Sequence, residues 1–284
     1  MTTHVVLGDG PAGCAAACAL RLASHDVVLA GRGRVHPPGT LELLSGRAAS
    51  ALVTLGLYDA VVSRALPCHM IVSRWGTASY DERPSLLEPF GHGWIVDRHW
   101  LDPLLRALAR AAGAVPGSGV PTVIATGQNA AGEWRPLGPD RVTLTAVVPS
   151  REELRGHLLV ESATTGWWSA LDDGVRCAFS WTVPAGPGRA ELIASWRRAL
   201  AVGPSVLPAD LDHRELTLRP SRSRLTTNLG PARVGDAALS VDPLSGHGLT
   251  LALEGAVRCL DPDHAVWLRG QAEEHADSAR LTYA

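Results

Sequence analysis

The stretch VVLGDGPAGCAAACAL, residues 5–20, passes from an apolar segment through three glycines into a row of small residues with helical spacing. Gly8 permits a tight turn after a strand, Gly10 lets a phosphate group approach the backbone, and Gly13 lets the helix pack closely on the strand. The start of such a helix presents free N–H groups and the positive end of the helix dipole. With the apolar segment DVVLAG at 26–31, the pattern predicts a dinucleotide site, and a plain glycine-rich turn is the alternative.

Composition limits the class of protein. The chain has 284 residues, of which 46% are hydrophobic and 19% are charged, enough for a large core in one or two domains. The formal net charge is −2 and no long basic stretch occurs, which argues against a nucleic-acid-binding surface. All 26 basic residues are arginine, because the chain contains no lysine.

The sequence shows no other catalytic or metal-binding signature. Five cysteines, at positions 14, 18, 68, 177 and 259, have no CxxC spacing, and we expect Cys14 and Cys18 to fill the core beside the first helix. The 11 histidines have no HExxH spacing. No apolar stretch reaches about 18 residues and no leader-like segment occurs. We therefore expect a soluble cytoplasmic protein with no metal and no membrane partner.

The order of elements predicts the architecture. Helical spacing marks residues 41–57, LELLSGRAASALVTLGL, and residues 100–113, WLDPLLRALARAAG. Strand-like segments dominate 140–227, with one short helix near 190–201, and 232–260 combines a strand, a turn, a glycine-rich loop and a helix. The sequence thus predicts a two-lobed α/β (α+β) protein. A Rossmann-like lobe with a parallel sheet is interleaved with a smaller β-rich lobe.

Four stretches resemble the flavin-dependent monooxygenases of the para-hydroxybenzoate hydroxylase fold. They are GDGPAG at 8–13, SRWGTASY to GHGWIVDRHWLDPLL within 73–105, VIATGQNA at 123–130, and VGDAALSVDPLSGHGLTLAL at 234–253. The branch that is most similar holds the tryptophan halogenases and the LodB/GoxB-type flavoproteins that modify peptidyl tryptophan. The resemblance implies an FAD-binding lobe formed by residues 1–60, 94–130 and 228–284. Residues 61–93 and 131–227 would form the substrate lobe.

The same resemblance assigns cofactor-binding residues. The glycine loop would hold the FAD pyrophosphate, the arginine of the DR motif would lie beside the cofactor, and the GDAA aspartate would contact the ribityl and pyrophosphate region. The loop at 243–248 would run along the flavin ring, where its histidine would tune the flavin or touch the substrate. A helix beginning at the end of this loop would stabilise negative charge on a reduced flavin. The residues concerned are Gly8, Gly10, Pro11, Ala12, Gly13, Arg98, Gly235, Asp236, Pro243, Gly246, His247, Gly248 and Leu249.

Some of these residues have plainer explanations. Arg98 alone would fit a surface salt bridge, Asp236 alone a helix cap, and His247 alone a solvent-facing loop.

One position departs from the dinucleotide pattern. An acidic residue usually ends the second strand, about 20 residues beyond the glycines, where it binds the ribose hydroxyls. Here Gly31 stands at that place and Arg32 follows it. This leaves open a loosely held adenosine or one held by Arg32 and Arg34, and it also leaves open an NADP-like 2′-phosphate site. If the adenosine is loosely held for want of a carboxylate, Gly31→Glu should tighten FAD binding.

The family chemistry and the nine tryptophans suggest the reaction. The resemblance implies that a flavin, reduced by NAD(P)H or by a separate flavin reductase, reacts with oxygen and oxidises the substrate, so no catalytic residue is assigned. Trp75 and Trp168 are candidate pocket residues; in TGWWSALDDG, alternation places Trp167 and Trp168 on opposite faces of a strand. We expect a small-molecule or peptide-borne, tryptophan-like substrate, with a flavin reductase or a substrate protein as a partner. Alternatives are an FAD-dependent dehydrogenase or reductase and a non-catalytic binding protein.

Halogenation is not expected. Halogenases of the branch that this chain resembles direct hypohalous acid to a lysine, which this chain lacks, and arginine is a poor substitute because its guanidinium is delocalised and stays protonated. The WxWxIP pattern of those enzymes is also absent from TGWWSALDDG.

Overall fold

A five-stranded parallel sheet forms the base of one lobe in the computed structural model, which describes residues 2–208, 211, 215–228 and 231–283. Its strand order is β17-β9-β1-β2-β8, and every neighbouring pair is parallel. In chain order the strands are β1 (Thr3–Leu7), β2 (Asp26–Ala30), β8 (Val115–Pro116), β9 (Val123–Ile124) and β17 (Ala232–Arg233). The central strand β1 carries the apolar run that the sequence showed, and its Val6 is fully buried in the core of this lobe.

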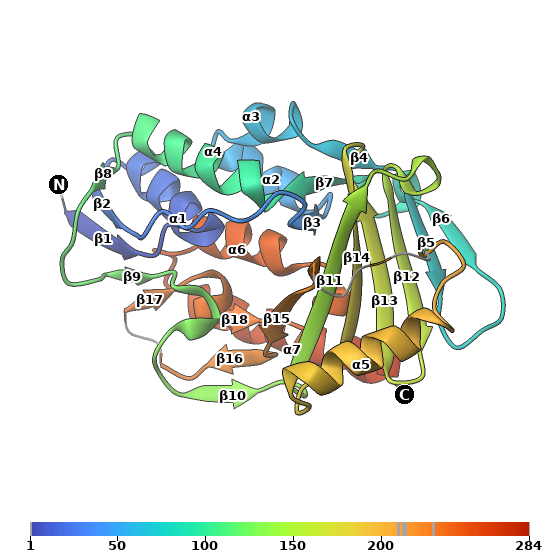
Figure 1. Ribbon diagram of the computed structural model, residues 1–284. Helices are drawn as coiled ribbons and strands as arrows, with labels where there is room; N and C mark the ends of the chain where they lie inside the picture. Colours follow the sequence, from blue (N-terminus) through green and yellow to red (C-terminus); the bar gives the residue numbers. More distant parts are fainter. Residues whose placement is uncertain (1, 209–210, 212–214, 229–230, 284) are drawn as a thin grey trace.

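Three helices pack together beside this sheet (Figure 1). They are α1 (Pro11–Leu22), α4 (Arg98–Ala111) and α6 (Gly248–Val257). The small side chains of α1 are buried almost throughout, so that α4 and α6 approach it closely. In α4, Leu101, Leu105 and Ala109 recur every four residues and face this core, and Asp97 caps the helix by accepting the N–H of His99 at 2.9 Å.

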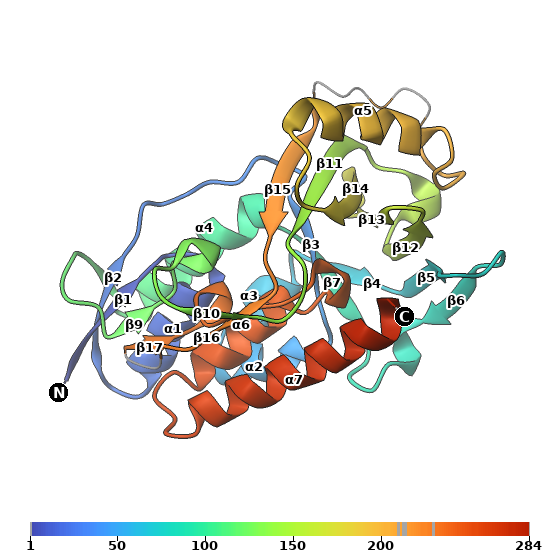
Figure 2. The same ribbon diagram turned by 90° about the horizontal axis from the view of Figure 1, so that it is seen from below.

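A seven-stranded sheet forms the second lobe, on the right of Figure 1. Its order is β15-β11-β14-β13-β12-β5-β6, antiparallel except between β12 and β5. The strands are β5 (Met70–Arg74), β6 (Asp81–Pro84), β11 (Arg141–Pro149), β12 (His157–Ala163), β13 (Gly166–Asp172), β14 (Arg176–Pro184) and β15 (Thr217–Ser221). Figure 2 shows α5 (Arg189–Leu200) lying across the outer side of this sheet.

Two three-stranded sheets and the remaining helices join these parts. One sheet has the order β3-β7-β4 and the other β10-β16-β18. Their strands are β3 (Leu41–Leu44), β4 (Leu66–Cys68), β7 (Gly93–Asp97), β10 (Trp134–Pro136), β16 (Arg224–Thr226) and β18 (Leu239–Ser240). The other helices are α2 (Ala48–Thr54), α3 (Tyr58–Val62) and α7 (His264–Tyr283), with 3₁₀ turns η1 (Ser85–Leu87), η2 (Gly127–Asn129), η3 (Glu152–Leu154), η5 (Gly235–Ala237) and η6 (Pro243–Ser245).

The helix predicted over 41–57 is partly wrong. Residues Leu41–Leu44 form β3 and pair antiparallel with β7, and only the later part of the stretch is helical, as α2. The apolar run LELL satisfies either a helix or a strand, and the pairing with a distant segment decides in favour of the strand.

The α/β class with a parallel sheet and a β-rich second lobe is confirmed. Both Cys14 and Cys18 are buried, as expected, and all five cysteines are free thiols. No helix within the described residues is both long and apolar enough to cross a bilayer.

Packing of α5 on the seven-stranded sheet generates a stability prediction. Trp196 of α5 is 0% exposed and lies 4.9 Å from Trp168, measured between ring centroids. Trp196→Ala should lower the free energy of unfolding by about 3–5 kcal/mol, measured by urea denaturation. Trp196→Phe should cost less, since it also removes an indole N–H that has no partner among the described residues. Val175→Ala, at a 65% exposed position, is the control and should change little. An unchanged midpoint for Trp196→Ala would contradict this account of the lobe.

Candidate functional site

The glycine loop forms a close backbone contact between β1, β9 and α1. A Cβ atom on Gly8, which has a φ of +115°, would lie 2.2 Å from the carbonyl oxygen of Ala125. A Cβ atom on Gly13 would lie 1.8 Å from the carbonyl oxygen of Gly8. At Gly10, the residue before α1, no atom lies within 4 Å of such a Cβ, and no side chain caps the helix. The first N–H groups of α1 are therefore open to an anion.

The second motif packs directly on the first. Gly235, in η5, is buried, and a Cβ atom there would meet Ala12 Cβ at 2.6 Å. The tertiary structure thus brings GDAA at 235–238 against the start of α1, and the next residue, Asp236, lines the adjoining cleft. Its carboxyl group is desolvated by burial and faces the negative charge of Glu42, which together raise its pKa to about 6.

A cleft of about 710 Å³ separates the two lobes. One wall comes from the loops of the first lobe, including Glu42, Arg98 and Asp236, and from the loop at 243–249. The other wall is the inner face of the seven-stranded sheet, which contributes Thr143, Thr145, Val160, Trp167, Ser180 and Thr182. A cleft of this size takes a ligand much larger than a single metabolite ring, which fits a dinucleotide together with a substrate.

Arg98 begins α4 at the edge of this cleft. Its guanidinium donates two hydrogen bonds to Asp102, at 2.6 and 3.0 Å, and one to Glu42 at 2.9 Å. Burial alone would lower the pKa of Arg98, but Glu42 and Asp102 outweigh it and raise that pKa. The surface salt bridge considered from sequence is therefore a partly buried ion-pair network, which fixes the guanidinium beside the cleft.

The loop at 243–249 brings a helix start to the cleft. Pro243, Gly246, Gly248 and Leu249 all line it, and Gly246 has a φ of +63°. Helix α6 begins at Gly248 without a side-chain cap, so its first N–H groups stay available beside the cleft. These residues lie together on one wall of the cleft, and their contact with a cofactor stays a prediction.

His247 lies on the other side of this loop. Its ring meets His275 of α7 edge-on, with centroids 5.4 Å apart. Burial, and then the charge of Arg47, lower its pKa, so that the imidazole is neutral. His247 is not among the residues that line the cleft. A direct contact with the flavin or the substrate remains a prediction.

The candidate tryptophans separate onto different surfaces. Both Trp167 and Trp168 are 2% exposed, but Trp167 borders the cleft, whereas Trp168 packs under α5 with Trp181 and Trp196. Helix α5 covers the face of the sheet on which Trp168 lies, so Trp168 does not border the cleft. Trp167, on the opposite face, is the candidate pocket residue instead. Trp75 does not line the cleft but adjoins Trp167 at 6.5 Å and donates its indole N–H to the carbonyl of Thr282.

One arginine of the cleft, Arg219, was missed from the sequence. Arg219, in β15, lines it and donates to Thr40 Oγ1 at 3.0 Å. Burial and the nearby charges of Arg98 and Arg34 lower its pKa, so this cation lies where an anionic group of a ligand would be favoured. Arg34 also lines the cleft, while Arg32 is exposed and borders no described cavity. Alternation along β15 is the signal that could have placed Arg219 on the inner face.

Groups suited to a metal ion are absent from the described parts of the chain. No cluster of three or more His, Cys, Asp or Glu side chains there is arranged to hold one.

The raised pKa of Asp236 predicts a pH-dependent stability of the apoprotein. Ionisation is harder in the folded state, so stability is highest while the carboxyl is protonated. It falls as pH rises from the unfolded value near 4 through about 6. The loss is about 3 kcal/mol at most. Asp236→Asn should leave the melting temperature unchanged at pH 4 and raise it at pH 7, measured without cofactor. An equal difference at both pH values would refute this assignment of the ionising group.

Comparison with known proteins places the fold. No family model matches the chain, and no curated protein matches it. Among solved structures, the peptidyl tryptophan dihydroxylase QhpG, essential for tryptophylquinone cofactor biogenesis, is 26% identical with a TM-score of 0.71. The alignment covers 98% of this chain and 71% of QhpG.

Two further solved structures show the same likeness at lower identity. PqsL, a probable FAD-dependent monooxygenase from Pseudomonas aeruginosa, is 17% identical with a TM-score of 0.73, over 99% of this chain and 93% of PqsL. A flavin-dependent halogenase from Xanthomonas campestris is 13% identical with a TM-score of 0.77, over 98% of this chain and 76% of the halogenase. The chain thus has the fold of the flavin-dependent monooxygenases that its sequence resembles.

Proposed function

We propose that this protein is an FAD-dependent monooxygenase that hydroxylates an aromatic or peptide-borne, tryptophan-like substrate. The observation that carries the proposal is a cleft of about 710 Å³ between the two lobes. Part of the predicted FAD-binding set lines one wall of it, and an aromatic and hydroxyl-bearing sheet face forms the other; the lining members of that set are Arg98, Asp236, Pro243, Gly246, Gly248 and Leu249.

The residues present fit FAD. The open backbone at Gly10 and the uncapped start of α1 suit a diphosphate, while Asp236 in the cleft suits a ribityl hydroxyl. When bound, FAD would supply the oxidation chemistry with molecular oxygen. The uncapped start of α6 faces the place of the flavin ring and favours negative charge there. Arg219, on the opposite sheet wall, adds positive charge to the cleft, whereas the charge of Arg98 is balanced by Asp102 and Glu42.

The inner sheet face would hold the substrate. Hydroxyl pairs cross its strands, Thr143 to Thr182 at 2.8 Å and Thr145 to Ser180 at 2.8 Å. They offer donors and acceptors to a polar edge, while Trp167 offers an aromatic surface. An aromatic substrate that carries N–H or O–H groups matches this lining. The tryptophan-like class is supported by QhpG, described as acting on peptidyl tryptophan.

Oxygenation is proposed in preference to halogenation. Halogenases occur among the structural neighbours, so the fold alone does not separate the two reactions. The chain has no lysine, and its 26 basic residues are all arginine. A guanidinium does not replace an ammonium group that must capture a halogen. We further propose that electrons come from NAD(P)H or from a partner flavin reductase.

The first test combines cofactor binding with turnover. The purified protein should bind FAD more tightly than FMN or NAD, measured by fluorescence titration. With FAD, a flavin reductase, NADH and oxygen, a tryptophan-containing peptide should gain oxygen atoms that derive from ¹⁸O₂, measured by mass spectrometry. Added bromide should not change the product.

Each other function has its own outcome in this test. A substrate oxidised equally well without oxygen indicates a dehydrogenase. A brominated product that depends on this protein would overturn the exclusion of halogenation. Binding of NAD at least as tight as that of FAD would exclude the proposed function.

A second test uses the neighbouring tryptophans as a matched pair. Trp167→Phe, on the cleft wall, should raise KM for the substrate several-fold with little effect on FAD affinity. Trp168→Phe, in the core under α5, should lower the melting temperature and leave KM unchanged. Substrate kinetics and thermal unfolding of both variants measure this contrast. The reverse pattern would move the substrate to the other face of the sheet.

A further inference from the structure

Gly31 leaves no room for a side chain, although it stands at the end of β2. In dinucleotide folds this position usually carries the carboxylate that binds the adenosine ribose. A Cβ atom on Gly31 would lie 2.1 Å from Asp9 Cγ and 2.3 Å from Asp9 Cβ. These distances are far below van der Waals contact. The space that an acidic side chain at 31 would use is therefore already filled by Asp9, so we expect Gly31→Glu to weaken FAD binding and not to tighten it.

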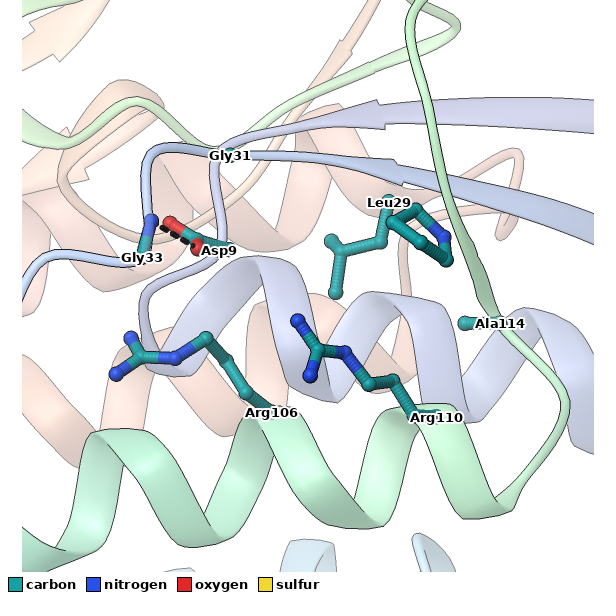
Figure 3. Close-up of a pocket in the computed structure, with 8 residues that line it drawn as sticks. Asp9, Leu29, Gly31, Gly33, Arg106, Arg110 and Ala114 are labelled. Carbon is teal, nitrogen blue, oxygen red and sulfur yellow. Dashed lines mark hydrogen bonds between the residues drawn. The ribbon is translucent and has the colours of Figure 1, made fainter.

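Asp9 comes from the middle of the glycine loop and turns toward the end of β2. Its Oδ2 accepts the N–H of Gly33 at 2.8 Å, which fixes the carboxylate beside Gly31 (Figure 3). A carboxylate within a diphosphate-binding loop repels the phosphates unless another partner compensates for its charge. The orientation of Asp9 puts its charge on the adenosine side of the loop.

A small cavity beside Asp9 holds an unpaired arginine. It has a volume of about 80 Å³ and is lined by Asp9, Gly31 and Gly33 together with Arg106 and Arg110 of α4. Figure 3 shows both arginine side chains extending from α4 toward the glycine loop. Arg106 is only 9% exposed, yet it makes no hydrogen bond or ion pair with any residue that the structure describes. None of its guanidinium nitrogens is among the fully buried polar atoms that lack a partner, so the aliphatic part of the side chain is buried while the charged end stays accessible to donate to a ligand in this cavity.

We propose that Asp9 replaces the missing carboxylate of β2 and accepts hydrogen bonds from the ribose hydroxyls of the FAD adenosine. Arg106 donates to the same adenosine moiety. The carboxylate that usually stands at the end of the second strand is thus supplied by Asp9 of the glycine loop, and the strand end carries Gly31 in its place. This inference rests on the proposed FAD-dependent function and adds a specificity-determining residue to it.

Four variants test the exchange. Asp9→Asn keeps the shape and removes the charge, and it should weaken FAD binding roughly tenfold or more. Asp9→Gly should weaken it similarly. Gly31→Glu alone should also bind poorly, because its side chain meets Asp9. The double variant Asp9→Gly with Gly31→Glu returns the carboxylate to the strand end, and it should recover most of the affinity. Fluorescence titration with FAD, and competition by ADP-ribose, measure the changes.

FMN is the ligand control, since it lacks the adenosine. Its affinity should be the same for Asp9→Asn as for the unchanged protein. Arg106→Met should weaken FAD and ADP-ribose binding without lowering the melting temperature of the apoprotein, because it keeps an unbranched buried side chain and breaks no hydrogen bond or ion pair with a described residue.

Unchanged FAD affinity in Asp9→Asn, or an equal loss for FMN, would overturn the inference. So would a double variant no better than Asp9→Gly, provided that its circular dichroism matches that of the unchanged protein; if it is unfolded, Asp9→Asn decides. Failure of the unchanged protein to bind FAD would instead contradict the proposed function, so the two failures are distinguishable.

Discussion

Direct backbone contact around the first turn of α1 is the constraint on which the rest of the molecule depends. Gly8 and Gly13 let β1, β9 and the helix meet with no side chain between them, and Gly235 lets the segment after β17 close against Ala12. Any larger residue at these places would push apart elements more than 100 residues distant in sequence. These contacts hold α1 against the parallel sheet and α6 against α1. They therefore also fix the positions of the loops that form the cleft wall.

The second lobe is joined to this assembly through a charged and aromatic link. Arg141, at the start of β11, pairs with Asp242 at 2.9 Å, next to the loop expected along the flavin. Its guanidinium also lies 4.8 Å from the Trp167 ring and 4.4 Å from the Tyr283 ring. An ion pair whose arginine also stacks on aromatic rings stabilises the fold more than an exposed ion pair does, because the aromatic faces shield its charge from water. The link connects the substrate-side sheet, the loop at 243–249 and the end of α7 at one point.

Charge in the cleft is distributed unequally. Arg98 is neutralised by Asp102 and Glu42, whereas Arg219 reaches only a hydroxyl of Thr40. The cleft therefore keeps the positive charge of Arg219, and the uncapped start of α6 borders the same cleft. This arrangement favours a ligand that carries phosphates and can hold further negative charge on reduction, as a flavin dinucleotide does.

The sequence by itself determined the local units. The glycine loop with its flanking strand and helix, the amphipathic α4 and the alternating strands of the second lobe follow from spacing and residue type, because each depends on contacts within a few residues. Which of Trp167 and Trp168 faces the cleft was decided by α5 covering one side of the sheet. The strand at Leu41–Leu44 was decided by its pairing with β7, and the absence of a carboxylate at Gly31 is explained only by Asp9 filling that space. These outcomes depend on contacts between segments far apart in the chain, and a local sequence pattern does not specify such contacts.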